Sequence, residues 1–198
     1  MSIVSNTPIK SLAVVTAATS SPIAQSEAKA HLRVTTSDED SYITSLITAA
    51  TQAAQNYTNS YFINTTLRMN FSYFPDSEFR LYGGKITSVS NIKYYNASDV
   101  LTTWDSSNYS VNLDAEPCLI TYGSSSTVPN TYIKTNAVVA TYVSGYGSSS
   151  SDVPMSIRQA ILILIGHFFE NRQEVVFGSP KVMPKASEWL LEPYRIVY

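Results

Sequence analysis

The sequence is poor in the residues that carry most enzyme chemistry. Among 198 residues it has one cysteine, Cys118, and two histidines, His31 and His167. A single cysteine excludes an intramolecular disulfide framework, and together these three residues provide no ligand set at the spacing of a zinc site. Cys118 precedes Leu119 and Ile120, so we expect a buried and unreactive thiol. Neither a metal nor a cofactor is expected.

The sequence also lacks the common catalytic motifs. It has no G-x-S-x-G, G-x-x-x-x-G-K-[ST] or G-x-G-x-x-G segment, and Gly145-Tyr146-Gly147 lies in a serine-rich stretch. Two acidic pairs have the residue types of an acid and a base, but Asp38 and Asp40 begin a helix and Asp114 and Glu116 lie in a turn. The sequence therefore gives no positive support to the hypothesis of a hydrolase, and no catalytic residue is predicted.

Charged residues are scarce as well. They make up 14% of the chain, against an ordinary ~25%, and the net charge is -2 without a cluster of Lys and Arg. This excludes sequence-independent binding of DNA. Ser, Thr, Asn and Tyr replace the missing charge, which is typical of a protein that packs against others. The uncharged run Gln159 to Phe169 is far shorter than the ~20 residues that cross a bilayer, so no membrane contact is expected.

The strongest element is an apolar helix near 154–173. Asp152 and Pro154 suit its first turn, and apolar residues recur at the i, i+3, i+4 spacing of a helix while also filling much of the opposite side. Such a helix must be covered on two sides, either by its own domain or by a neighbouring subunit. Its end changes to the polar residues Glu170, Asn171, Arg172 and Glu174.

Two further helices are predicted near 24–32 and 38–59. The second has Thr36 three residues before Glu39, which predicts a capping box, and Asp38 to Asp40 place negative charge at its start. Between the helical parts, alternation from Thr65 to Tyr73 and short apolar runs with turn residues predict a small antiparallel sheet or barrel. Further strands are predicted at 79–82, 90–95, 109–113, 118–122 and 137–143.

The fold class predicted is thus α+β, a helical core with an inserted small antiparallel β domain and an extended C-terminal tail. Residues 1–22 are predicted to form an arm in which Leu12 to Val15 can pair as a strand, and Gly145 to Ser151 a flexible hinge. The expected domains are an arm (1–22), a helical core (23–60 and 152–176), a β insertion (61–147) and an apolar C-terminal docking tail (177–198).

Six stretches together resemble the head-tail connector family of tailed bacteriophages, also called adaptor or head-completion proteins. They occur in the family's order and span nearly the whole chain. They are AKAHLRV (28–34), DEDSYITSLITAATQAAQNYT (38–58), ITSVSNIKYY (86–95), VVATYVSGYG (138–147), VPMSIRQAILILIGHFFENRQE (153–174) and LLEPYRIV (190–197).

The resemblance implies a structural protein of the virion neck, assembled in the host cytoplasm. It implies a ring of about twelve copies under the portal vertex, a channel through which double-stranded DNA passes without specific binding, and a face for a stopper or tail protein. The C-terminal segment would contact the portal. The polar end of the apolar helix would contact a neighbouring subunit. The candidates are Trp189, Leu190, Leu191, Tyr194 and Arg195 for the portal, and Glu170, Asn171, Arg172 and Glu174 for the subunit interface.

One alternative stays open on the residues alone. Fourteen tyrosines, two tryptophans and many Asn, Ser and Thr side chains also suit a carbohydrate- or surface-binding β module. That hypothesis predicts exposed aromatic side chains on the β insertion. The adaptor hypothesis predicts instead that removing Trp189 to Tyr198 abolishes portal binding and leaves the fold intact.

Overall fold

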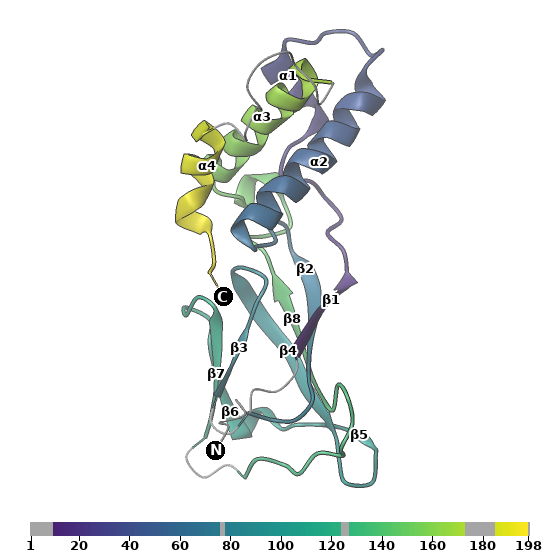
Figure 1. Cartoon of the computed structure of the whole chain (residues 1–198), viewed down its shortest axis with the longest axis vertical. Helices are drawn as coiled ribbons and strands as arrows, with labels where there is room; N and C mark the ends of the chain where they lie inside the picture. Colours follow the sequence, from purple (N-terminus) through teal and green to yellow (C-terminus); the bar gives the residue numbers. More distant parts are fainter. Residues whose placement is uncertain (1–9, 76–77, 124–126, 173–184, 198) are drawn as a thin grey trace, which may run out of the picture. The chain divides into compact units, whose positions relative to one another are not determined.

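The structure is a computed structural model that describes residues 10–75, 78–123, 127–172 and 185–197. The chain forms two compact units, each built from two separate stretches (Figure 1). The β unit contains the residues up to Ala17 and Thr65–Gly145, and the helical unit contains Ala18–Asn64 and Tyr146–Tyr198. The α+β class predicted from the sequence is confirmed, since helices and antiparallel sheets are both present.

The helical unit is built around α3 (Met155–Glu170), which has α2 (Asp40–Thr58), α1 (Gln25–Leu32) and α4 (Lys185–Leu191) packed against it. Ile157, Ile161 and Ile165 of α3 are fully buried. They meet a face of α2 whose alanines, Ala50 and Ala54, allow the two helices to approach closely. The apolar periodicity therefore predicted the central helix correctly, and its two-sided burial occurs within the helical unit.

One local prediction about the helical unit was wrong. Helix α2 begins at Asp40 with Glu39 as its N-cap and no side-chain capping bond, so Thr36 lies too far upstream to cap it. The hinge predicted at Gly145 to Ser151 contains the boundary between the two units, and its part in the helical unit forms hydrogen bonds there. Tyr146 donates its N–H to the carbonyl of Phe62 (3.0 Å), and Ser149 and Asp152 form a reciprocal capping box.

Ion pairs join α1 to its neighbours. Arg158 of α3 donates to both carboxylate oxygens of Glu27 at 2.8 and 2.9 Å, and Lys29 lies 2.5 Å from Asp40 at the start of α2. His31 lies across Gly166 of α3, where an added Cβ would meet its Nε2 at 3.4 Å. The small helix is thus fixed by charge and by one close approach, since only Ala28 of its side chains is buried.

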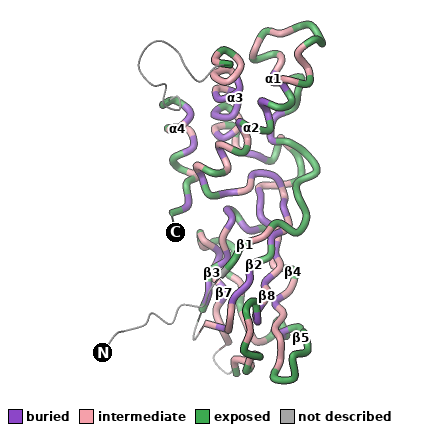
Figure 2. Tube along the Cα trace, turned by 45° about the vertical axis from the view of Figure 1, so that its right-hand side comes forward, coloured by how far each residue is buried: buried purple, intermediate pink, exposed green. Residues whose placement is uncertain are grey.

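The β unit consists of two antiparallel sheets, with strand orders β1-β2-β8-β4-β5 and β3-β7-β6. In the larger sheet, Leu67 of β2 pairs with Tyr142 of β8, and both are fully buried. Buried and intermediate residues alternate along β8, as the colours in Figure 2 show. The strands are β1 Lys10–Thr16, β2 Thr65–Phe71, β3 Glu78–Leu81, β4 Ile86–Tyr95, β5 Leu101–Thr103, β6 Tyr109–Asn112, β7 Cys118–Tyr122 and β8 Val138–Ser144.

Aromatic side chains fill the space between the two sheets. Trp104 is 4% exposed and has Phe74, Tyr109 and Tyr122 around it, with ring centroids 4.8, 5.1 and 5.3 Å away. Phe71 and Phe79 meet edge to face at 5.1 Å. Of the tyrosines and tryptophans on which the alternative hypothesis relied, Trp104 and Tyr142 are thus buried in the core of the β unit.

The strand expected at Leu12 to Val15 is present as β1, and it pairs with β2 inside the β unit instead of belonging to a separate arm. The C-terminal end differs from the expected structure. Residues 185–191, expected in an extended tail, form α4. Leu191, buried on the side of α4 that packs on the helical core, gives this short segment the contact that stabilises a helix.

Candidate docking site

The C-terminal segment packs against the helical unit. Leu191 is fully buried in the helical core, and Tyr194 meets Tyr146 edge to face with centroids 6.4 Å apart. The backbone then runs along the end of α2, where Ile196 donates its N–H to Thr58 (3.0 Å) and accepts from the side-chain amide of Asn59 (2.9 Å). The segment is therefore anchored at both α4 and its last described residues.

A polar contact with Tyr57 fixes the turn between these anchors. The Tyr57 hydroxyl donates to Glu192 Oε2 at 2.5 Å, and the guanidinium of Arg195 lies 5.2 Å from the Tyr57 ring centroid. This hydrogen bond, with a smaller contribution from desolvation, raises the pKa of Tyr57 above its ordinary value. No local sequence signal marks Tyr57 as the receptor for this turn, because the partners are 135 residues apart.

The five portal candidates divide into two kinds in the structure. Leu191 belongs to the core, and Leu190 and Tyr194 are half-buried against it. Trp189 is 76% exposed, and Arg195 is also exposed. A partner can thus reach Trp189 and Arg195 directly, while the other three residues hold the segment in place.

Two of the four subunit-interface candidates at the end of α3, Asn171 and Arg172, already interact with residues of the helical unit. Arg172 pairs with Glu39, and its guanidinium lies 4.6 Å from the Tyr42 ring centroid. The hydrogen bond that Arg172 donates to the Glu39 carboxylate raises the pKa of Arg172. Asn171 donates its side-chain amide to the carbonyl of His167 (2.7 Å), which caps the helix. Glu170 is exposed, and Glu174 lies outside the described residues.

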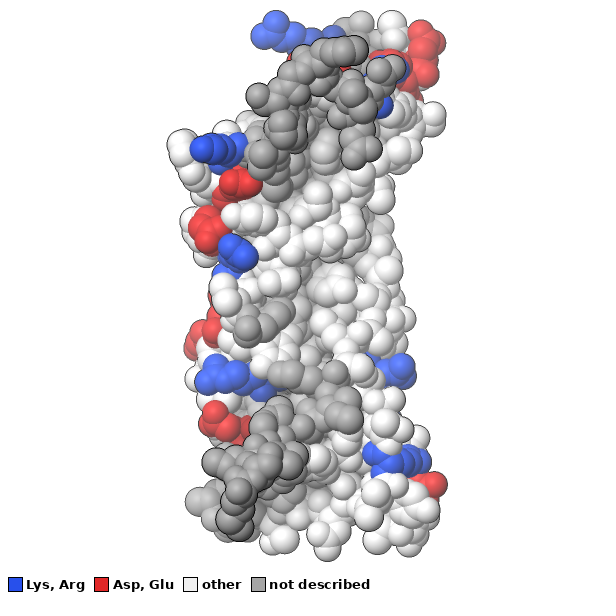
Figure 3. All heavy atoms as spheres, viewed as in Figure 1, with Lys and Arg blue, Asp and Glu red and all other residues white. Residues whose placement is uncertain are grey.

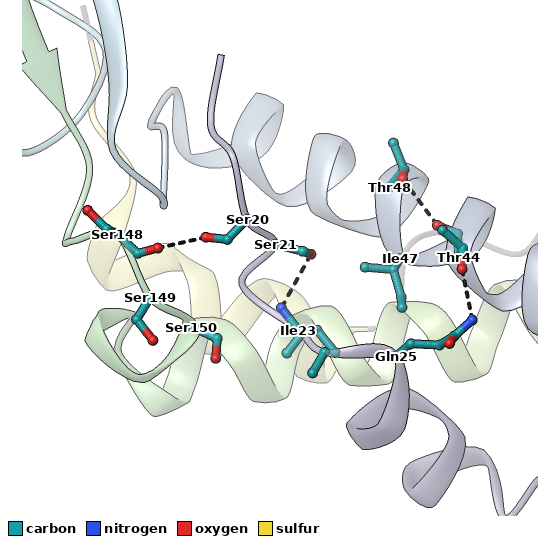
Figure 4. A pocket seen from close by; sticks show the side chains of 11 residues that line it. Ser20, Ser21, Ile23, Gln25, Thr44, Ile47, Thr48, Ser148, Ser149 and Ser150 are labelled. Carbon is teal, nitrogen blue, oxygen red and sulfur yellow. Dashed lines mark hydrogen bonds between the residues drawn. The ribbon is translucent and has the colours of Figure 1, made fainter. Parts of the chain in front are cut away.

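A pocket of about 500 Å³ opens in the helical unit (Figure 4). Hydroxyl groups surround an apolar floor that includes Ile23 and Ile47, and no lining residue is charged. Ser20 donates to the carbonyl of Ser148 (2.7 Å), and the side-chain amide of Gln25 donates to Thr44 Oγ1 (3.0 Å). A pocket without an acid, a base or a cation is suited to holding a neutral group and has no catalytic set.

The side chains with the most reactive chemistry are separated from one another. Cys118 is buried in β7, and desolvation raises its thiol pKa from 9.0 to about 11. His167 is half-buried on α3 and has its Nδ1 3.3 Å from the amide of Asn171. Among the described residues no three His, Cys, Asp or Glu side chains gather as a metal site would require.

The surface charges give no strong field on the face seen in Figure 3. Lys and Arg side chains alternate there with Asp and Glu, and uncharged residues cover most of the surface. Within the part of the chain that the structure describes, no helix is both long and apolar enough to span a bilayer. Uncharged contacts between protein surfaces are the interaction that such a surface suits.

Comparison with known proteins agrees with the resemblance in the sequence. The model of a family described as phage gp6-like head-tail connector protein matches residues 25–114, which include α1, α2 and the β unit from β2 through β6. A search of curated proteins finds no match.

Solved structures share the fold of nearly the whole chain. A chain in the neck of an empty gene transfer agent particle, computed with C6 symmetry, is 21% identical with a TM-score of 0.78, and the match covers 95% of this chain and 96% of that one. A chain in the neck of the native particle, computed with C12 symmetry, is also 21% identical with a TM-score of 0.72 and the same coverage. A match in the virion of the native gene transfer agent is 21% identical, has a TM-score of 0.76, and covers 94% of this chain and 96% of that one.

The family match begins in the helical unit and continues through most of the β unit, and the shared fold extends over both. The chain is thus similar to the phage gp6-like head-tail connectors over residues 25–114, and it shares the fold of the neck chains along nearly its whole length.

Proposed function

We propose that this protein is a structural component of a virion neck, a ring-forming adaptor between the portal vertex and the tail. The observation that carries the proposal is the combination of the connector family match with a fold shared along 95% of the chain with a neck component. In this role the ring extends the DNA channel and provides the attachment site for a stopper or tail protein. The neck chains it resembles stand in assemblies of C6 and C12 symmetry, which supports a ring of about twelve copies.

The distribution of charge supports passage of DNA without capture. Neutralising phosphates with Lys and Arg is the main source of affinity for DNA. This chain has 13 such residues against 15 acidic ones, and Arg158, Arg172 and Lys29 already pair with carboxylates of the same unit. A ring of such chains would let the genome slide through its channel.

The C-terminal segment is proposed as the portal contact, with Trp189 as its central residue. Trp189 is a large aromatic side chain that is mostly exposed on a helix anchored by Leu191. Exposed aromatic residues of this kind often contribute most to an interface, because a partner can remove their whole surface from water. Arg195, beside the Tyr57 ring, would add a polar contact at the rim.

At the other end of the helical unit, Glu170 is proposed as a contact between neighbouring subunits. It is exposed at the end of α3, whereas Asn171 and Arg172 support that end from within their own subunit. Mutating Glu170 is therefore expected to affect assembly alone, and mutating Arg172 to loosen the helix end as well.

The test of the adaptor function is the native mass of the full chain, alone and with the portal protein encoded by the same genome. The expected result is a ring that forms with the portal. The deletion of Trp189 to Tyr198 is a poor test, because it also removes Leu191 and Ile196, both buried. Trp189→Ala keeps these anchors. Its matched control is Met155→Ala, which truncates another exposed apolar side chain of the helical unit.

A further inference from the structure

The larger sheet of the β unit begins with β1, an edge strand whose only charged residue is Lys10 at its start and whose register shifts once, between Val14 and Thr16. In the described part of the chain β1 pairs only with β2, so one side of its backbone is open. Ser11 to Thr16 contain neither a charged residue nor a proline, and Leu12, Val14 and Val15 are 42%, 46% and 53% exposed. Proteins ordinarily block such edges with charge, proline or a covering segment, because an open edge recruits another strand.

The opposite side of the same sheet has a second open edge. Strand β5 pairs only with Lys93 to Tyr95 of β4, which leaves Ile86 to Asn91 without a neighbouring strand on that side among the described residues. Thr87, Ser88 and Ser90 are exposed, and this stretch too has no charged residue. The sheet therefore ends in two open edges whose uncharged stretches are equally long, six residues in β1 (Ser11 to Thr16) and six in β4 (Ile86 to Asn91).

The direction of the strands makes these two edges complementary between copies. Strands β1, β2, β8 and β4 alternate in direction, because each neighbouring pair is antiparallel. Copies related by rotation about a ring axis keep the same orientation along that axis. The β1 edge of one copy therefore faces the β4 edge of the next in the antiparallel sense, without inverting either subunit.

Apolar side chains at the two edges also lie on the same face of the sheet. Val14 pairs with Leu67, Leu67 with Tyr142, and Tyr142 with Val89, so Val14 and Val89 lie on the same face as the buried Leu67 and Tyr142. Joining β1 to β4 of the next copy would place Val14 and Leu12 beside Val89. The buried face of one sheet would then continue into that of its neighbour.

We propose that β1 of each copy pairs with the Ile86 to Asn91 edge of β4 in the neighbouring copy, joining the sheets around the ring. This inference rests on the proposed adaptor function, because only a closed ring uses both edges of every copy. The irregular register of β4 against β8, between Ile86 and Ser88 and between Val89 and Asn91, fits this arrangement. Bulges of this kind curve a sheet, as closure requires.

The first test places two lysines on the open edge of β1. Leu12→Lys with Val14→Lys is expected to raise the protein concentration for half-maximal ring assembly about tenfold or more, measured by native mass with and without portal. The control is Ile133→Lys, a change of the same chemistry at a side chain that is 97% exposed in the β unit but lies outside both edges. Assembly of the double variant at the wild-type concentration would overturn the proposal.

The second test does not depend on weakening the fold. Val14→Cys and Val89→Cys are made in separate full-length chains, mixed and oxidised, with Leu12→Cys replacing Val14→Cys to allow a register shifted by two residues. A disulfide-linked pair is expected only in the mixture, and native Cys118 is buried. Cross-linking of Val14→Cys with itself would mean twofold pairing of β1 edges and would overturn the proposal, as would the absence of any link.

The outcomes separate this inference from the adaptor function. Rings that form without the β1 to β4 link leave the adaptor function standing and refute the strand pairing. Wild-type protein that forms no ring, alone or with portal, refutes both.

Discussion

Two neighbouring residues of α4 should have opposite roles, and separating them tests the anchored C-terminal segment. Leu191 is fully buried and Trp189 is 76% exposed. Leu191→Ala removes buried methyl groups from the helical core and should lower the free energy of unfolding by about 2–5 kcal/mol. Trp189→Ala loses only the buried quarter of a side chain of about 150–250 Å², which corresponds to about 1 kcal/mol or somewhat more.

For portal binding the order of the two variants should reverse. The exposed three quarters of Trp189 correspond to about 110–190 Å², or at most about 3–5 kcal/mol if a partner covers them fully. Part of this favourable free energy is offset by the entropy lost when the interface becomes ordered. We therefore expect Trp189→Ala to weaken portal binding by about 2 kcal/mol, which is about 30-fold. Leu191→Ala should bind more nearly like the wild type under conditions where it remains folded.

Urea unfolding measures the first effect, with an unchanged m-value showing that the folded state is otherwise intact. Binding of the full chain to portal, measured by titration, gives the second. Trp189→Ala with wild-type affinity would refute the portal contact. Leu191→Ala with wild-type stability would refute the anchoring of α4 on the core.

Three further predictions concern the fold itself. Gly147→Ala should destabilise the protein by about 1–3 kcal/mol, because the added Cβ would lie 2.2 Å from Asp152 Oδ2, whereas Gly166→Ala should be neutral or stabilising by up to about 1 kcal/mol; thermal unfolding of both variants measures this. Arg158→Met should lower the free energy of unfolding by about 1–3 kcal/mol, because it leaves Glu27 without its hydrogen bonds at 2.8 and 2.9 Å. Lys134→Met removes a more exposed ion pair, and an equal loss of stability in that variant would contradict the role assigned to Arg158. Burial raises the pKa of the Cys118 thiol to about 11, so the thiol should react with a thiol reagent at pH 8 only after unfolding. Because this folded-state pKa exceeds the ordinary value of 9.0, the contribution of Cys118 to stability is complete below pH 9 and is lost as the pH rises from 9 to 11.

The elements with strong periodicity could be predicted from the sequence. Helix α3 was expected near 154–173, and its described part runs over Met155–Glu170, because a long apolar pattern leaves few alternatives to a buried helix. Alternation similarly predicted β2, and a short apolar run that follows turn residues predicted β8. Strand β5 was missed because its three residues are too few for a period to appear, and the capping box at Thr36 was predicted in the wrong place because the motif occurs before the helix begins.

The packing of the C-terminal segment, the candidate docking site, was predicted only in part. An apolar C-terminal segment indicated docking, but the sequence does not distinguish Leu191, which packs on its own core, from Trp189, which faces solvent. That difference depends on which side of α4 meets α3, and the partners of the following turn, Tyr57 and Asn59, come from the far end of α2. Contacts between residues so distant in the chain leave no local signal.

The account's central claim, that this chain is a ring-forming neck adaptor, is tested most directly by the native mass of the full-length protein mixed with its portal. The account predicts a complex in which one portal carries a ring of about twelve copies, and loss of that complex for Trp189→Ala but not for Met155→Ala. A wild-type chain that remains monomeric and ignores the portal at every concentration would contradict it.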